Sequence, residues 1–290
     1  MQDPVRYTSL NQAYSSLIAH VLTNGQQVSP RGMGTTEVLS ANFIISDPRS
    51  RILTSSVRKW SLPLAIGELC WHLRGRDDTA WLAYYATAWE RFTDDGVTVP
   101  GSCYGKKLFA EAMSGQSVWD RLKSLLTNDP ATRRAAVSFL RERDDLESSR
   151  DVSCVSSIQF FLREDKLHLF VNMRSNDLYL GLPYDVFLFS FLQELMSVEL
   201  ECELGEYHHY ASSLHLYDRH LERAKALVGT GSKEGGTMEK LTSVRQIEAV
   251  LAAEESLRAG GHVERGGMDT YTRPLVRELE RHRGQVTGRK

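Results

Sequence analysis

The sequence predicts a protein of the α/β (α+β) class, because segments with helical and with strand patterns follow one another along the chain. Two apolar runs, about 156–162 and 167–173, are separated by a short charged turn and predict a β-hairpin. Residues 62–75 combine helical spacing of apolar groups with a proline near the start and a glycine at the end. Pro183 then opens a long apolar helix, expected to reach about Leu200.

Size and charge limit the classes of function. With 290 residues, 41% of them hydrophobic, the chain can bury one sizeable core, or form one domain with an appendage. A net charge of −2 gives no reason to expect a polyanionic partner, so binding to nucleic acid is not predicted.

The cysteines and the N-terminus predict a cytoplasmic protein. Four cysteines are scattered without a CxxC pair or a zinc-like spacing, which favours thiols in a reducing compartment. The N-terminus lacks a signal pattern, and no apolar run reaches the ~20 residues that would span a membrane. His209 and His220 suggest a metal at first sight, but no ligand spacing supports one, so no metal site is predicted.

In the N-terminal part, apolar spacing predicts a helix over 7–23. A glycine-rich basic turn, 29–36, leads into an alternating segment, 38–45, and by itself is most simply a surface loop. Within the helix at 62–75, Glu68 lies among apolar residues, where a carboxylate is costly unless it is paired or functional. A solvent-facing Glu on an amphipathic helix is the plainer interpretation.

The middle of the chain predicts a helix over 117–127, a break at 128–130 and a strand over 135–140. Arg133 and Arg134 precede that strand, and a double Arg is usually only solvated charge.

The hairpin places two chemically interesting residues side by side. Its far end brings Cys154 close to Arg174. A thiol beside a guanidinium is more thiolate-like than an isolated one, and the thiolate is the nucleophile. Cys154 is therefore a candidate nucleophile.

The tail differs from the rest. Residues 229–236 resemble a linker, an amphipathic helix is expected around Met238–Arg258, and a second glycine-rich break precedes a charged terminal helix. We therefore expect a catalytic domain over 1–228, with 229–290 as a helical C-terminal extension packed on the same domain.

Three motifs together resemble the thymidylate synthase superfamily. They are Cys154, then Arg-Ser-x-Asp at 174–177, then Leu-Gly-Leu-Pro-Tyr-Asp at 180–185. Each is weak alone, but their joint spacing is specific, and the resemblance extends over roughly 25–225. It implies a thymidylate synthase-like fold, in which one mixed β-sheet is layered with helices, and an obligate homodimer.

The resemblance assigns residues that would bind the phosphate and the sugar of a pyrimidine nucleoside monophosphate. Arg31, Arg174 and Ser175 match phosphate-holding positions, and His215 and Tyr217 match the His-x-Tyr pair that binds the sugar. Arg133 and Arg134 match the segment that reaches the neighbouring subunit's active site. Paired guanidiniums suit a phosphate dianion.

It also assigns the catalytic and folate-binding groups. Cys154, Glu68, Asp177 and Tyr104 match catalytic positions, with 5,10-methylenetetrahydrofolate as the cofactor. The matching folate-binding residues are Arg58, Trp89 and Asp177, although Arg58 replaces the family's usual Lys. A Cys154 thiolate that adds to C6 makes C5 of the base able to attack the one-carbon unit.

Asp185 bears on the choice of base. At this position synthases acting on dUMP carry Asn, whereas the cytidylate hydroxymethylases of the superfamily carry Asp. A carboxyl can accept from the 4-amino group of cytosine while sharing a proton with N3, and a mismatched buried pair costs about 1–3 kcal/mol per unpaired group. The plainer alternative is that Asp185 caps the following helix.

Two departures from the synthases point the same way. Val155 stands where synthases carry a His near the uracil O4, and the short apolar tail that closes over folate is missing. The resemblance therefore favours a cytidylate 5-hydroxymethyltransferase acting on dCMP or CMP, in which Glu68 activates the added water. Two alternatives stay open: a dUMP methylase of the thymidylate synthase type, and a catalytically silent nucleotide-binding homologue.

Overall fold

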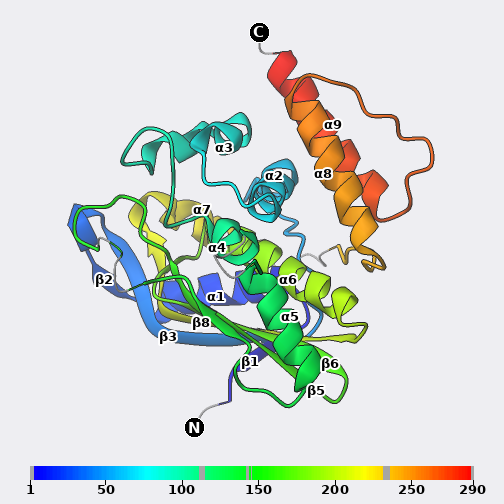
Figure 1. Cartoon of the computed structure of the whole chain (residues 1–290). Helices are drawn as coiled ribbons and strands as arrows, with labels where there is room; N and C mark the ends of the chain where they lie inside the picture. Colours follow the sequence, from blue (N-terminus) through cyan, green and yellow to red (C-terminus); the bar gives the residue numbers. More distant parts are fainter. Residues whose placement is uncertain (1–2, 111–114, 142–143, 145, 231–235, 289–290) are drawn as a thin grey trace. The chain divides into compact units, whose positions relative to one another are not determined.

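The computed structural model describes residues 3–110, 115–141, 144, 146–230 and 236–288 (Figure 1). Most of the linker predicted at 229–236 lies outside this part of the chain. The chain forms two compact units. The first unit comprises 1–60, 125–138 and 154–238, and the second comprises 61–124, 139–153 and 239–290. The boundary expected at 228/229 stays a prediction.

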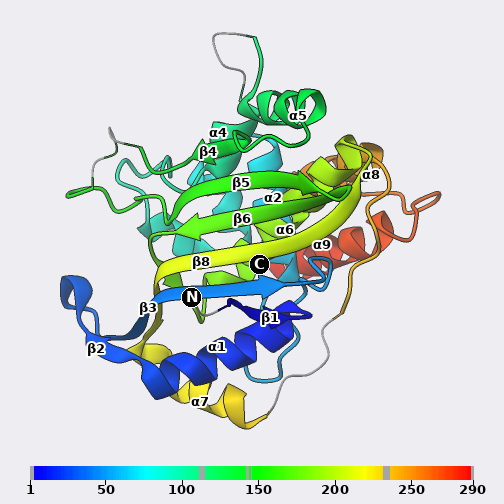
Figure 2. The same ribbon diagram turned by 90° about the horizontal axis from the view of Figure 1, so that it is seen from below.

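The first unit is built on a mixed sheet with the strand order β1-β3-β8-β6-β5-β4, seen in Figure 2. β3 and β8 are antiparallel, β8 and β6 are parallel, and β6 and β5 are antiparallel. Two short strands pair outside this path, β2 with β3 and β7 with β8. The strands are β1 (Val5–Tyr7), β2 (Gln26–Val28), β3 (Thr35–Ile45), β4 (Ala136–Ser138), β5 (Val155–Arg163), β6 (Lys166–Met173), β7 (Asn176–Asp177) and β8 (Glu203–Tyr217).

The predicted hairpin is confirmed as β5 and β6, with Arg163 paired to Lys166. Its two turn residues, Glu164 and Asp165, have φ of 51° and 59°. Positive φ at both central positions is the mark of a type I′ turn, whose twist matches that of the strands. The hairpin therefore closes tightly without a glycine.

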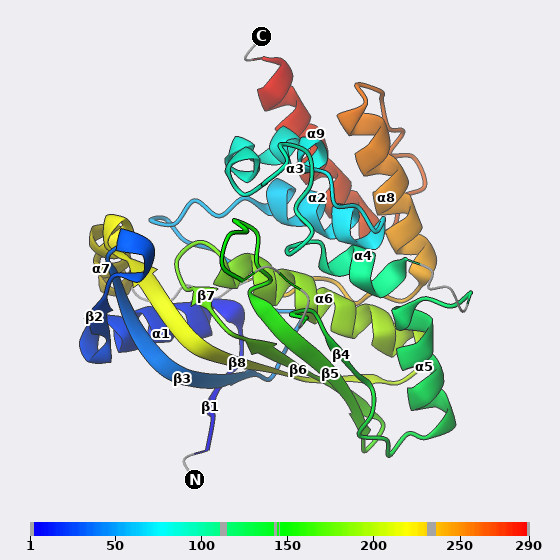
Figure 3. The ribbon, with the colours of Figure 1, turned by 60° about the vertical axis from the view of Figure 1, so that its left-hand side comes forward.

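Three helices accompany this sheet: α1 (Leu10–Asn24), α6 (Leu182–Glu199) and α7 (Leu221–Gly229). The Ser9 side chain caps α1. α6 is apolar on nearly every side. It packs on β6 and β8, and Figure 3 shows it beside these strands. α1 and α6 were predicted to within three residues, because apolar patterns mark both and a leading proline also marks α6.

One charged pair lies in the core of this unit. Arg51 is fully buried and bonds Glu194 of α6, which is 2% exposed. Breaking such a pair from one side leaves a buried charge, so we expect Glu194→Ala to lower the free energy of unfolding by about 3–5 kcal/mol. Chemical denaturation measures this. Glu222→Ala, which breaks an exposed pair with Lys225, is the control and should change it by less than about 1 kcal/mol.

The second unit is helical. Its main helices are α2 (Leu62–Leu73), α3 (Thr79–Tyr85), α4 (Tyr104–Phe109), α8 (Val244–Arg258) and α9 (Thr272–Thr287), and α5 (Val118–Asn128) begins in it. The three short 3-10 turns of the described chain are η1 (Pro30–Gly32), η2 (Thr87–Arg91) and η3 (Asp218–His220). α8 starts at Val244 rather than at the predicted Met238, because Ser243 and Gln246 form a capping box.

The C-terminal helices pack within this unit, against α2 and against each other. Glu254 of α8 is fully buried, and its carboxylate accepts hydrogen bonds from Tyr85 Oη at 2.8 Å and Arg258 Nε at 2.9 Å. The Arg258 guanidinium lies 3.6 Å from the centre of the Trp81 ring. α8 is thus attached to α3 by a buried polar contact and a cation–π contact. No helix within the described residues has the length and apolar character needed to cross a bilayer.

Candidate active site

The end of the β5–β6 hairpin carries the candidate nucleophile. The Arg174 N–H donates to the Cys154 carbonyl at 2.9 Å, so the two residues are neighbours, as predicted. Both are exposed, and Ser175 is half-buried. The backbone bond keeps Arg174 next to Cys154, and an exposed sulfur can be reached by an incoming electrophile.

β7 connects this hairpin end to β8. Asp177 pairs with His215, and the Leu178 N–H donates to the His215 carbonyl at 2.9 Å. The Asp177 Oδ1 accepts backbone N–H groups of Tyr179 and Leu180 at 2.9 and 3.0 Å. These bonds fix the orientation of the Asp177 carboxylate.

Electrostatics shows that the predicted sugar-binding pair belongs to the same neighbourhood. The rings of His215 and Tyr217 meet edge to face, with centroids 5.1 Å apart. Burial raises the pKa of the Tyr217 hydroxyl; Asp177 and Cys154 raise it further, and Arg31 is among the groups that lower it. Burial lowers the pKa of His215, and Asp177 partly offsets this. Asp177, Cys154 and Arg31 are therefore close enough to Tyr217 to influence its pKa, and Asp177 also influences the pKa of His215.

Asp185 lies in the first turn of α6, but it does not cap the helix. The N-cap is Gly181, and the Asp185 Oδ2 instead accepts the Asn176 Nδ2–H at 2.8 Å. Part of the residue stays accessible, yet protein atoms surround the carboxyl group. Burial raises the pKa of Asp185 to about 7, and the charge of Asp177 adds to the rise. This carboxyl can hold a proton near neutral pH.

Asn176 links Asp185 to two residues of β8. Its Oδ1 lies 3.0 Å from His209 Nε2, and His209 Nδ1 lies 2.9 Å from Tyr207 Oη. All three side chains are buried. The sequence suggested His209 only as a metal candidate, although Tyr207 and His209 alternate on one strand and so face the same side. That spacing was the signal available in the sequence.

In the second unit, two predicted residues meet. The Trp89 Nε1–H donates to the Glu68 Oε1 at 3.1 Å, and both side chains are half-buried. Glu68 is therefore not simply a solvent-facing residue, because it is half-buried and hydrogen-bonded to Trp89. Tyr104 lies deeper: it is 7% exposed and stacks on His72 at 5.5 Å between centroids. Burial lowers the pKa of His72 to about 3, so the stacked imidazole is neutral.

Known proteins resemble this chain along most of its length. A sequence model of the family described as thymidylate synthase matches residues 12–255. The thymidylate synthase of Bacillus phage phi3T is 30% identical over 235 residues, which cover 75% of this chain and 83% of the relative. The chain belongs to the thymidylate synthase family.

Further comparisons agree with this membership. The thymidylate synthase of Bacillus atrophaeus is 32% identical over 180 residues, covering 60% of this chain and 78% of that protein. The solved structure of thermostable thymidylate synthase A from Bacillus subtilis matches with a TM-score of 0.67 at 26% identity, over 81% of this chain and 91% of that chain. The predicted thymidylate synthase-like fold is confirmed. The chain is thus a one-carbon transferase of the thymidylate synthase type, a family that uses methylenetetrahydrofolate as donor.

The roles assigned from the sequence to Arg58, Arg133 and Arg134 remain predictions. Arg58 is 9% exposed, and its guanidinium donates to the carbonyls of Tyr179 and Lys59 at 3.1 and 2.8 Å. Arg133 and Arg134 are both exposed ahead of β4. The Arg133 backbone carbonyl accepts a hydrogen bond from the Gln159 side-chain amide at 2.8 Å. This bond holds the backbone of Arg133 and does not involve its guanidinium.

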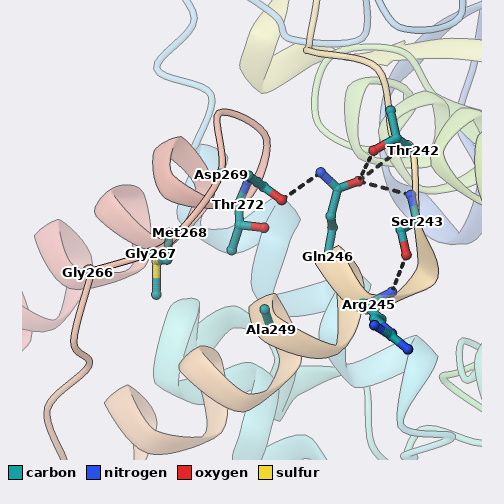
Figure 4. Close-up of a pocket in the computed structure, with 10 residues that line it drawn as sticks. All are labelled: Thr242, Ser243, Arg245, Gln246, Ala249, Gly266, Gly267, Met268, Asp269 and Thr272. Carbon is teal, nitrogen blue, oxygen red and sulfur yellow. Dashed lines mark hydrogen bonds between the residues drawn. The ribbon is translucent and has the colours of Figure 1, made fainter.

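Two further features lie apart from the family motifs. A shallow pocket of about 420 Å³ lies beside α8 and the start of α9, where Gln246 bonds Asp269 at 2.8 Å (Figure 4). It contains none of the predicted site residues. On β6 and β8, His168, Glu206 and His208 come close enough to share a metal, but Arg6 forms an ion pair with Glu206. The carboxylate already faces a cation, and we assign no metal to this group.

Proposed function

We propose that this thymidylate synthase family member is a cytidylate 5-hydroxymethyltransferase. It transfers a one-carbon unit from 5,10-methylenetetrahydrofolate to C5 of dCMP or CMP, with addition of water. The observation that carries the proposal is Asp185, a largely enclosed carboxyl whose pKa is raised to about 7. A protonated carboxyl offers one donor and one acceptor, which complement N3 and the 4-amino group of cytosine.

The first unit supplies groups for the nucleotide. The Cys154 thiolate adds to C6 and forms a covalent adduct, after which C5 is nucleophilic. Arg174 and Ser175 adjoin Cys154 in the hairpin and, with Arg31, are assigned to the phosphate. His215 and Tyr217 are assigned to the sugar.

The donor set also suits the folate. Asp177 holds a carboxylate oriented by two backbone N–H groups, and a carboxylate suits the N–H donors of a pterin ring. Trp89 offers a half-buried indole whose orientation the Glu68 bond fixes. Arg58 is also assigned to the folate, and backbone carbonyls accept two of its five N–H donors. When bound, methylenetetrahydrofolate supplies the one-carbon unit; Glu68 is assigned to activating the added water and Tyr104 to the neighbourhood of the base.

The second candidate is a dUMP methylase, and one specific finding favours it. The relatives at about 30% identity are named thymidylate synthases. Their names support this alternative better than the hydroxymethylase. Against it stand Asp185 and Val155, since base choice depends on single donor and acceptor groups rather than on overall identity. A catalytically silent nucleotide-binding homologue is the third candidate, but Cys154 and Glu68 are both retained.

Product analysis by mass spectrometry separates these candidates. The protein is incubated with methylenetetrahydrofolate and, in separate reactions, dCMP, CMP, dUMP and UMP. A gain of CH2O on a cytosine nucleotide, with tetrahydrofolate released, is the expected result and also identifies the sugar. A gain of CH2 on dUMP with dihydrofolate formed would replace our proposal by the methylase. No product from any nucleotide would favour the silent homologue.

We also propose that the active protein is a homodimer whose Arg133 and Arg134 reach the neighbouring active site. Their exposure leaves both guanidiniums available to a partner. Cys154→Ser and an Arg133→Ala/Arg134→Ala double variant should each be poorly active alone. Mixed under subunit exchange they should regain activity, because each heterodimer then holds one intact site. Failure to regain activity, with exchange verified by native mass spectrometry, would contradict shared sites.

A further inference from the structure

Four side chains of the first unit form one continuous hydrogen-bonded chain. Tyr207 Oη and His209 Nδ1 are 2.9 Å apart, His209 Nε2 and Asn176 Oδ1 are 3.0 Å apart, and Asn176 Nδ2 and Asp185 Oδ2 are 2.8 Å apart. We call these residues the relay. We propose that Tyr207, His209 and Asn176 are positioning residues that fix which oxygen of the Asp185 carboxyl carries a proton, and thereby which pyrimidine edge the site accepts.

The direction of every bond follows from Asn176. An amide nitrogen only donates and an amide oxygen only accepts. The Asp185 Oδ2 therefore accepts, and His209 Nε2 carries a hydrogen. Burial lowers the pKa of His209 to about 3, so the ring is neutral and holds only that one hydrogen. Nδ1 must then accept, and the Tyr207 hydroxyl donates to it. Each of the three hydrogen bonds is therefore donated by the residue farther from Asp185 to the next residue toward it.

This direction constrains the proton on Asp185. With Oδ2 held as an acceptor, a proton on the carboxyl occupies Oδ1. A neutral carboxyl whose proton moved freely between its oxygens would pair with either base, since uracil and cytosine present donor and acceptor in opposite order at N3 and C4. A carboxyl whose donor oxygen and acceptor oxygen are fixed can pair with only one of the two base edges. The inference rests on the proposed function for the statement that this edge is cytosine's.

The relay is held rigidly. Tyr207 and His209 are fully buried, and Asn176 is 2% exposed. The His209 ring stacks on Phe43 of the neighbouring strand, with centroids 4.8 Å apart and planes 20° apart. Burying a phenol, an imidazole and an amide is costly unless each is hydrogen-bonded, and a fully bonded buried network specifies one arrangement. An apolar core would fill this space at lower cost, which argues for a role beyond packing.

The charged groups around Asp185 do not fix the order by themselves. Asp177 raises the pKa of Asp185 through its charge, whereas the Asn176 hydrogen bond lowers it. Burial raises the pKa of the Tyr207 hydroxyl, and Asp185 adds to the rise, so that donor stays protonated. Burial is the main reason that Asp185 can be neutral, and the relay determines where the proton lies.

The test compares base preference in relay variants. His209→Phe keeps a flat ring on Phe43 and removes both hydrogen bonds, and Tyr207→Phe removes one hydroxyl. We expect the ratio of kcat/KM for the preferred base to that for the other to fall about tenfold in His209→Phe, and less in Tyr207→Phe. His209→Gln, whose amide can donate to Asn176, should restore part of the ratio. Tyr210→Phe, which changes the half-buried tyrosine next along β8, is the matched control and should leave the ratio unchanged.

A second readout does not depend on turnover. Carbon-13 NMR of labelled aspartate follows the Asp185 carboxyl during a pH titration, with Asp185→Asn to assign the signal. Loosening the relay weakens the Asn176 bond, so the pKa of Asp185 should rise in His209→Phe and Tyr207→Phe. Folded variants that keep both the ratio and the titration of the parent protein would overturn the inference. If the parent prefers uracil nucleotides, the cytidylate proposal fails, yet the relay still predicts that the variants lose that preference.

Discussion

Cys154→Ser is expected to lower turnover about a thousandfold or more while leaving the fold and nucleotide binding intact. A serine hydroxyl is almost entirely protonated at neutral pH and is a far weaker nucleophile than a thiolate beside a guanidinium. Loss of a covalent nucleophile typically removes several orders of magnitude of rate. Steady-state assays with saturating folate measure the loss, and calorimetric titration with the nucleotide measures binding.

Tritium exchange isolates the covalent step. Addition of Cys154 to C6 makes the hydrogen on C5 exchangeable, so nucleotide labelled at C5 should release tritium with the parent protein and not with Cys154→Ser. Cys202→Ser is the control: Cys202 is half-buried, and burial raises its pKa to about 11, so its thiol is protonated at neutral pH. A Cys154→Ser protein that kept full turnover would rule out the covalent mechanism.

Local patterns were enough to predict the hairpin and the long helix. The apolar runs of β5 and β6 flank a turn that can only be short, so the pairing of Arg163 with Lys166 follows from the spacing alone. α6 begins where Pro183 permits a helix and continues as long as the residues stay apolar. Because these signals are local, the position of Cys154 beside Arg174 was predictable without any tertiary information.

The parts that the sequence did not reveal depend on long-range pairing. β1 and β2 are three residues each and both pair with β3, a long-range pairing that no local pattern shows. The relay joins Asn176 to His209, 33 positions apart, through the parallel pairing of β7 and β8. The sequence favoured base recognition by Asp185 and left helix capping as the alternative, and capping is excluded only by the structure, in which Gly181 is the N-cap and Asp185 accepts from Asn176.

Asp185→Asn is expected to reverse the base preference. An amide in place of the carboxyl suits uracil when its nitrogen takes the Oδ2 position and its oxygen takes the Oδ1 position. The nitrogen then donates to O4 and to the Asn176 amide oxygen, which has to turn toward it, and the oxygen accepts from N3–H. Each mismatched buried group costs about 1–3 kcal/mol, so the ratio of kcat/KM for cytosine to uracil nucleotides should fall at least about tenfold. Competition between dCMP and dUMP in one reaction measures this ratio directly.

The pH profile gives an independent check with a definite sign. Cytosine pairing needs the protonated carboxyl, so with a pKa of about 7 the kcat/KM for a cytosine nucleotide should fall as pH rises through 7. The same group affects stability. Its pKa in the folded chain is raised above the ordinary 3.8, so the folded state binds the proton more tightly than the unfolded state, and the free energy of unfolding falls between about pH 4 and 7.

Asp185→Asn should abolish both dependences together, because one proton underlies them. Asp165→Asn is the matched control: this exposed turn residue has φ of 59°, which Asn tolerates, and neither the base ratio nor the pH profile should change. If the variant kept its preference for cytosine, base choice would have to come from other groups, and Asp185 would be reduced to a buried partner of Asn176. A parent profile flat from pH 6 to 8 would contradict the protonated form as the binding state, even if the base ratio changed as expected.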